Sequence, residues 1–211
     1  MSTSTISTTG TVTVVERPTP MVLSVARRLR QSFAGGATFS PIDELRVVRL
    51  KSATDAQQVF VSFYGPAVCV AADSDQDAEL TAEARWTDPV PEDWEEAAAG
   101  TFAQELHSLL SGVEHSWQDA AQSFWTRGKG LPGMPASLGV YCFDENSTAE
   151  FGDSGADHYQ FLGTSVALAR LFSGSSLITD ELRGGELALD GTSANFSALV
   201  GANLKVVCGE I

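Results

Sequence analysis

Glycines divide the chain after residue 158 into short segments whose lengths match those of helices and strands. An aromatic and apolar run at 159–162 ends at Gly163, as a short buried strand would. Thr164 then stands where its hydroxyl oxygen can cap a helix over 165–172, whose apolar residues recur at helical spacing. Gly174 comes where a left-handed residue is expected to end that helix. The stretch therefore begins as a strand followed by a helix.

The same punctuation continues towards the end of the sequence. A second short helix is predicted over 176–183, because a pair of glycines comes directly after it and would stop it. Residues 186–190 alternate polar and apolar side chains, which is typical of a half-buried strand. Thr192 can cap a third helix, and we expect Gly201 to end it. The sequence thus predicts strand, helix, helix, strand and helix in this order.

This order resembles the carboxy-terminal half of the sterol carrier protein 2 (SCP2-like) domain. The most specific match is 185–191, Gly-Glu-Leu-Ala-Leu-Asp-Gly, which has the family's strand pattern of alternating apolar residues between glycines. The motifs cover about a quarter of the chain, at 158–207, and the rest is similar only in the order of its elements. The resemblance implies a small carrier domain with an apolar tunnel for a fatty acyl, acyl-CoA or steroid-like ligand.

We therefore expect an α/β (α+β) protein with a mostly antiparallel sheet covered by helices. The resemblance implies one SCP2-like domain over 21–211, after a flexible tail at 1–20. An amphipathic helix pattern covers 21–33, and several short β segments come after it, as at the start of an SCP2-like domain. These β segments are 45–50, 59–64, 67–71 and 79–86. Residues 88–135 have a largely helical pattern without a family counterpart, so we expect a helical insertion there.

The resemblance also implies which side chains line the tunnel. A site for an apolar ligand needs a cavity with apolar walls and a few polar groups that orient the ligand. The candidates for the wall are Leu168, Leu171, Phe172 and Leu177, with Phe196 and Leu199 from the last helix. Each of these residues can equally be an ordinary core residue, and that alternative stays open.

One catalytic motif is partly matched by the sequence. Residues 163–167 lie between a predicted strand and a predicted helix, where the nucleophile elbow of α/β-hydrolases is found. Ala167 replaces the last glycine of that motif, and no histidine occurs after His158, although that fold places its histidine after the serine. We therefore interpret Ser165 as a first-turn residue of a helix and name no catalytic residue. An enzyme or enzyme subunit acting on a lipid-like substrate remains the alternative to a carrier.

Metal and cofactor sites are not indicated by the sequence. The acidic residues at 73–79 resemble the start of a calcium loop, but Ala78 stands where that loop requires glycine. His107 and His115 have no third ligand at metal spacing, so we interpret them as surface or interface residues. We expect no metal ion and no cofactor.

Charge limits the partners that this chain can bind. The formal net charge of −14 opposes non-specific binding to nucleic acid and docking on anionic membranes. Arg27, Arg28 and Arg30 give the helix at 21–33 a basic side, which is either a patch for an anionic group or a solvated face. No apolar run approaches the ~20 residues that span a bilayer, and no secretory signal is evident, so we expect a cytoplasmic protein. The expected partner is an apolar small molecule or lipid, with a non-catalytic role in protein assembly through the middle helices as a further alternative.

Overall fold

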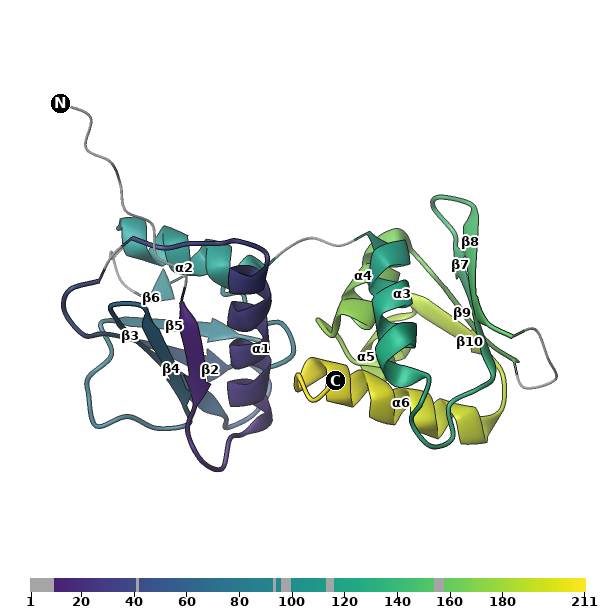
Figure 1. Cartoon of the computed structure of the whole chain (residues 1–211), viewed down its shortest axis with the longest axis horizontal. Helices are drawn as coiled ribbons and strands as arrows, with labels where there is room; N and C mark the ends of the chain where they lie inside the picture. The colour runs from purple at the N-terminus through teal and green to yellow at the C-terminus, as the bar shows by residue number, and fades with distance from the viewer. Residues whose placement is uncertain (1–9, 41, 93, 96–99, 113–115, 154–157) are drawn as a thin grey trace. The chain divides into compact units, whose positions relative to one another are not determined.

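The computed structural model divides the chain into two compact units, which we call unit 1 (1–114) and unit 2 (115–211). Each unit has its own sheet and its own buried apolar cluster. In Figure 1, unit 1 is coloured purple to teal and unit 2 green to yellow. The structure describes residues 10–40, 42–92, 94–95, 100–112, 116–153 and 158–211.

The described residues of unit 1 form one mixed sheet and two helices. Its strands are β1 (Thr11–Val14), β2 (Arg46–Ser52), β3 (Gln58–Tyr64), β4 (Ala67–Ala71), β5 (Leu80–Ala84) and β6 (Trp94–Glu95), and its helices are α1 (Pro20–Ala34) and α2 (Thr101–Ser111). The strand order is β1-β4-β3-β2-β5-β6. β2 pairs antiparallel with β3 and parallel with β5, so it lies at the centre of the sheet.

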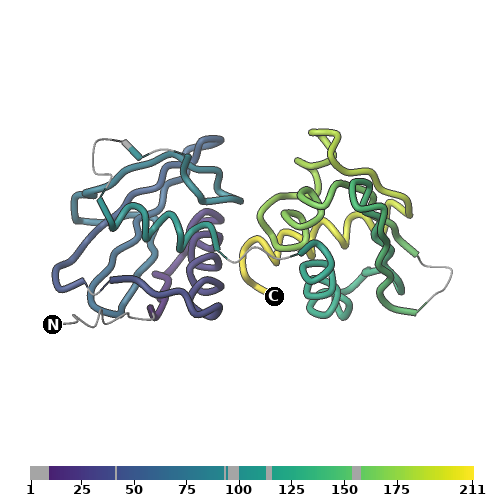
Figure 2. The backbone as a smooth tube through the Cα atoms, turned by 90° about the horizontal axis from the view of Figure 1, so that it is seen from above, coloured from purple at the N-terminus to yellow at the C-terminus, as the bar shows by residue number. Residues whose placement is uncertain are grey.

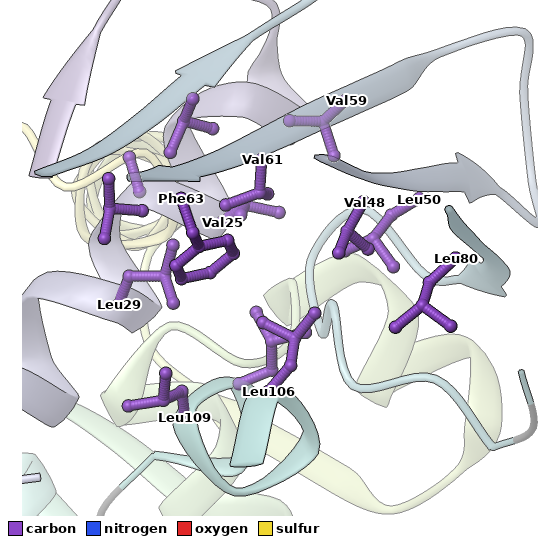
Figure 3. Close-up of a cluster of buried hydrophobic side chains, with 14 of the residues drawn as sticks. Val25, Leu29, Val48, Leu50, Val59, Val61, Phe63, Leu80, Leu106 and Leu109 are labelled. Carbon is purple, nitrogen blue, oxygen red and sulfur yellow. The ribbon is translucent and has the colours of Figure 1, made fainter. Parts of the chain in front are cut away.

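Alternating side chains place the core of unit 1 on one face of its sheet. In β3, Val59, Val61 and Phe63 are fully buried, whereas the residues between them are only half-buried. This alternation results from the two-residue period of a strand. Figure 3 shows Val25 and Leu29 of α1 pointing towards this face, with side chains of α2 beside them. The two helices therefore form the second layer of unit 1.

Unit 2 has a smaller mixed sheet and more helices. Its elements are α3 (Trp117–Gly128), β7 (Ser137–Cys142), β8 (Ser147–Gly152), β9 (His158–Gly163), α4 (Ser165–Ser173), α5 (Ile178–Gly184), β10 (Leu187–Asp190) and α6 (Ser193–Val207). The strand order is β10-β9-β7-β8, with β7 parallel to β9 and the other pairs antiparallel. The backbone of this unit can be traced in Figure 2 from green to yellow.

The two units share one pattern of connections. In each unit a helix precedes the central strand, which pairs antiparallel with the next strand in sequence, β2 with β3 and β7 with β8. A later strand, β5 or β9, returns parallel on the other side of the central strand. An antiparallel edge strand, β6 or β10, comes next, and a helix ends the unit. Unit 1 has β4 and β1 in addition.

The predicted α+β class and the mostly antiparallel pairing are confirmed. Within the described ranges, five strand pairs are antiparallel and three are parallel. All five elements predicted between 158 and 207 are present in the predicted order. The prediction for the end of the last helix is wrong, because α6 continues through Gly201 to Val207. Leu199, Ala202 and Val206 bury one face of α6, and this burial outweighs the cost of about 1 kcal/mol for a helical glycine.

The division into two units differs from the single domain expected over 21–211. The expected insertion at 88–135 is shared between the units, because α2 packs on α1 in unit 1 and α3 packs on α4 in unit 2. The expected tail at 1–20 contains strand β1, while its residues 1–9 lie outside the described part of the chain. The sequence pattern does not predict strand β8, because only Ala149 and Phe151 are apolar in this strand of a polar, acidic stretch.

Candidate functional site

Four of the six predicted wall residues lie in one buried cluster of unit 2. Leu168, Leu171 and Phe172 belong to α4 and Leu199 to α6, and none is more than 1% exposed. Phe172 packs against Phe124 and Phe161, with ring centroids 5.3 and 5.4 Å apart. The structure thus brings residues from two predicted helices together with aromatic side chains of α3 and β9.

The other two predicted wall residues are only half-buried, and of these two only Phe196 packs against this cluster. Phe196 is half-buried and packs against it from the start of α6. Leu177 is half-buried at the N-cap of α5. Leu182 and Leu189 are further partly buried residues that contact the cluster. An apolar region therefore extends from the fully buried residues of α4 to half-buried side chains on α5, β10 and α6.

A buried asparagine ties the helices around this cluster together. Asn203 of α6 is 1% exposed, and its amide nitrogen donates to the carbonyl oxygens of Leu171 and Ser176 at 3.0 and 3.1 Å. Its side-chain oxygen accepts a hydrogen bond of 3.1 Å from the amide of Ile178. Nothing in the local sequence pattern points to this residue, because its partners lie more than twenty positions earlier. It positions the loop between α4 and α5.

A carboxylate near the cluster is also largely buried. Glu181 of α5 is 4% exposed, and its Oε1 lies 3.1 Å from a guanidinium nitrogen of Arg170. Arg170 keeps 44% of its side chain exposed. This ion pair is a polar group at the edge of an apolar region, of the kind that orients ligands in apolar sites.

Ser165 has a structural environment that fits a helix start. Thr164 is the N-cap of α4, and its hydroxyl oxygen accepts a hydrogen bond from the amide of Ala167 at 3.2 Å. The Ser165 hydroxyl donates to Asp144 at 2.6 Å, and its amide donates to the same carboxylate at 2.8 Å. Hydrogen bonds from the Cys142 thiol and from Ser165 hold the pKa of Asp144 well below its usual range. The Ser165 hydroxyl is thus hydrogen-bonded to a carboxylate, which does not activate a hydroxyl as a histidine base does.

A serine and a histidine do meet elsewhere in unit 2. The Ser137 hydroxyl lies 2.9 Å from Nδ1 of His158, across the β7–β9 pair. A Cβ at Gly139 would lie 2.9 Å from the His158 ring and 3.0 Å from a carboxylate oxygen of Glu150. Ser137 is only 2% exposed, so its hydroxyl is not accessible to a substrate. We interpret this cluster as hydrogen bonding that stabilises the pairing of β7 with its neighbours.

The basic side predicted for the first helix is mostly not a free surface. Arg27 and Arg28 are 4% and 8% exposed. Arg28 forms an ion pair with Asp88 at 2.9 Å, and Arg27 donates to Gln31 at 3.0 Å. Burial lowers the pKa of Arg28, and the charge of Asp88 opposes this effect. These arginines therefore have structural roles in unit 1.

Two open grooves are present among the described residues. The groove in unit 1, called the β2–α2 groove, has a volume of about 620 Å³ and is bounded by Ser40, residues 42–46, Glu79 and the first turns of α2. The groove in unit 2 has a similar volume, about 610 Å³, and lies between the end of α3, the loop before β7 and the end of β8. Neither groove includes any of the six predicted wall residues.

The described residues contain no group of three or more histidine, cysteine or acidic residues that could hold a metal ion. His115 lies outside them, and His107 lies near the hydroxyl of Ser111. No helix in the described ranges has both the length and the apolarity needed to cross a bilayer.

The sequence matches no protein-family model and no curated protein.

Proposed function

We propose that this protein is a non-catalytic carrier, and that unit 2 binds an apolar ligand such as a fatty acyl, acyl-CoA or steroid-like molecule. The main support is the meeting of Leu168, Leu171, Phe172 and Leu199 in one apolar cluster that continues to half-buried residues. The order of elements from β9 to α6 is also the order on which the resemblance to the SCP2-like family rests. The polar pair Arg170 and Glu181 lies at the edge of this apolar region.

The ligand requires space that the packed cluster has to provide. Leu182 of α5 and Phe196 of α6 are half-buried at its margin, so a movement of α5 or of the start of α6 would open the cluster without breaking the sheet. α5 is a short helix that contacts α4, α6 and β10, and its N-cap has no side-chain hydrogen bond. We therefore propose that the ligand enters beside α5.

A cytoplasmic location forms part of the same proposal. The three cysteines, Cys69, Cys142 and Cys208, are free thiols, and free thiols are typical of reducing compartments. Burial raises the pKa of the Cys142 thiol, which lowers its reactivity.

The proposal is tested by filling the expected ligand space. Leu177→Trp enlarges a half-buried side chain at the N-cap of α5, next in sequence to Ile178 of the cluster, where the site can accept more volume. We expect this variant to lose binding of a fluorescent long-chain fatty acid while its melting temperature changes little. Leu168→Trp enlarges a fully buried residue, and overpacking there costs about 1–3 kcal/mol if no ligand space exists.

Val166→Trp is the matched control, because Val166 lies on the same helix as Leu168 and is 64% exposed. It adds the same side chain without entering the cluster, so binding should persist. The carrier proposal should be dropped if the wild-type protein binds no apolar probe and both cluster variants unfold. Binding that survives Leu177→Trp and Leu168→Trp equally well would place the ligand elsewhere.

A further inference from the structure

The β2–α2 groove of unit 1 has an acidic rim and an apolar floor. Ile42 and Phe102 are each 7% exposed and form the floor, while Leu45 at the rim is 50% exposed. A large apolar side chain that is half exposed beside a groove has surface left to bury against a partner. The groove therefore offers both charge and apolar contact.

The charges along the groove are strongly unbalanced. Among the described residues that line it, four are carboxylates and Arg46 is the one cation. These carboxylates are Asp43, Glu44, Glu79 and Glu105. Arg46 is already neutralised by Glu79, with two contacts of 2.7 and 3.1 Å. The remaining negative charge can attract a cationic partner.

The acidic side chains differ in how firmly they are held. Glu105 accepts hydrogen bonds from the amide of Ser40, at 3.3 Å, and from its hydroxyl. Asp43 and Glu44 are exposed and have no hydrogen bond or ion pair with any described residue. One part of the rim is thus preorganised, and another part retains its full capacity to accept hydrogen bonds.

Arg46 shows how this groove accommodates a guanidinium. Its Cζ lies 3.8 Å from the centroid of the Phe102 ring while Glu79 binds its nitrogens in a fork. Stacking on an aromatic face together with a bidentate carboxylate contact is the arrangement that arginine favours at interfaces. The chain therefore already places one arginine in the geometry that an incoming basic residue would need beside the free carboxylates.

We propose that the β2–α2 groove binds a basic segment of a partner protein, in which arginine or lysine alternates with apolar residues. The basic residues meet Asp43 and Glu44, and an apolar residue covers Leu45 and the edge of Phe102. A volume of about 620 Å³ suits a few side chains of a peptide and exceeds what a single ion needs. The net charge of −14 attracts such a segment from a distance. This inference concerns unit 1 and does not depend on the carrier proposal for unit 2.

The test uses a fluorescently labelled peptide of alternating arginine and leucine, titrated with the full chain and monitored by anisotropy. We expect saturable binding that weakens as salt is added, because the rim charges are exposed. Asp43→Asn combined with Glu44→Gln removes two charges and leaves the shape of the groove unchanged. This double variant should bind about fivefold more weakly, the size expected for two solvent-exposed charge contacts.

Asp73→Asn combined with Asp75→Asn is the matched control. It removes the same charge from the acidic turn between β4 and β5, which does not line the groove. The control should bind the peptide within about twofold of wild type. Leu45→Ser should weaken binding of the peptide and leave the salt dependence of that binding unchanged, because it removes only an apolar contact.

Three results would overturn the proposal. Equal weakening by the groove variant and the control would show a general attraction to an acidic protein. Absence of any saturable binding would remove the site altogether. Equally tight binding of an arginine–serine peptide would show that the apolar floor has no part and that the groove does not select the proposed segment.

Discussion

Unit 1 and unit 2 use the same strand connections but differ in the helices placed after the strand that runs parallel to the central one. In unit 1, β5 leads to the short edge strand β6 without an intervening helix among the described residues. In unit 2, α4 and α5 lie between β9 and β10 and cover the sheet together with α3 and α6. Unit 1 keeps an acidic groove beside its central strand, whereas unit 2 has a larger helical layer over an apolar cluster.

This difference shows how one pattern of connections can support two kinds of binding surface. The sheet and its two flanking helices provide a core in both units, and the additional helices of unit 2 supply the residues assigned to the proposed ligand site. Function is carried by sites that a fold presents and does not derive from the fold itself. We therefore expect that each unit can be altered with little effect on the other.

The largest effect on stability is expected at Asn203 of unit 2, which hydrogen-bonds α6 to the chain between α4 and α5. Asn203→Ala removes the partner of two carbonyl groups and one amide, which lie in the last turn of α4, in the loop after it and at the first residue of α5. Since each buried hydrogen bond contributes about 1 kcal/mol, the loss should be about 3 kcal/mol. Hydrogen exchange measured by mass spectrometry should show faster exchange in the peptides of unit 2 alone. Equal acceleration in unit 1 would contradict the independence of the two units.

In unit 1 a single side-chain hydrogen bond from Ser32 joins α1 to α2, so removing it should cost less stability. The Ser32 hydroxyl of α1 donates one hydrogen bond of 2.6 Å to the carbonyl oxygen of Leu109 in α2. Ser32→Ala should therefore cost about 1 kcal/mol. The accelerated exchange should be confined to peptides of α1 and α2. A cost as large as that of Asn203→Ala would show that α2 is held in a different way.

A smaller, pH-dependent effect is expected at Asp144. The pKa of Asp144 in the folded protein lies below the ordinary value for aspartate. Its charge therefore stabilises unit 2 at every pH above that ordinary pKa. This contribution is lost as the pH falls from about 4 towards the lower pKa of the folded state. Asp144→Asn should thus lower the melting temperature at pH 7, and the difference from wild type should disappear in acid.

Asp55 provides the matching carboxylate in unit 1. Hydrogen bonds from the amide and side chain of Gln57 lower its pKa, so the sign of the pH dependence is the same. Asp55 supports only a turn between β2 and β3, whereas Asp144 supports the start of a helix. Asp55→Asn should therefore have the smaller effect at pH 7. A pH-independent difference in either variant would show that the charge is not responsible.

The smallest effect is expected for Ser165→Ala. The variant loses the hydroxyl contact to Asp144, while the amide of residue 165 can still donate to that carboxylate. The cost should be at most about 1 kcal/mol, and ligand binding should be unchanged. A fluorophosphonate probe should not label Ser165, because its hydroxyl faces a carboxylate and no histidine. Labelling at this residue would favour an enzyme over a carrier.

Local signals in the sequence predict most of the element boundaries. Thr164 caps α4, Gly174 ends it with a φ of 77°, and Gly185 ends α5 with a φ of 76°. These residues act on neighbours within a few positions, so their role can be read from the order of residues alone. The sequence also indicates the apolar cluster, because Leu168 and Leu199 each belong to a set of apolar residues that recur at helical spacing within one segment.

Features that depend on distant residues cannot be predicted in this way. Asp144 reaches Ser165 from twenty-one positions earlier, and Asn203 reaches the loop before α5 from a later helix. The division into two units has the same cause, because it depends on which helix packs on which sheet. No local sequence signal near residue 114 predicts the boundary between the units, and 113–115 lie outside the described part of the chain.

Native mass spectrometry of the freshly purified full chain tests the carrier proposal most directly. The proposal predicts a population that carries one apolar molecule per chain, present in wild type and in Val166→Trp but absent from folded Leu177→Trp. A mass that corresponds only to the unliganded chain, together with no uptake of an added long-chain fatty acid, would contradict it.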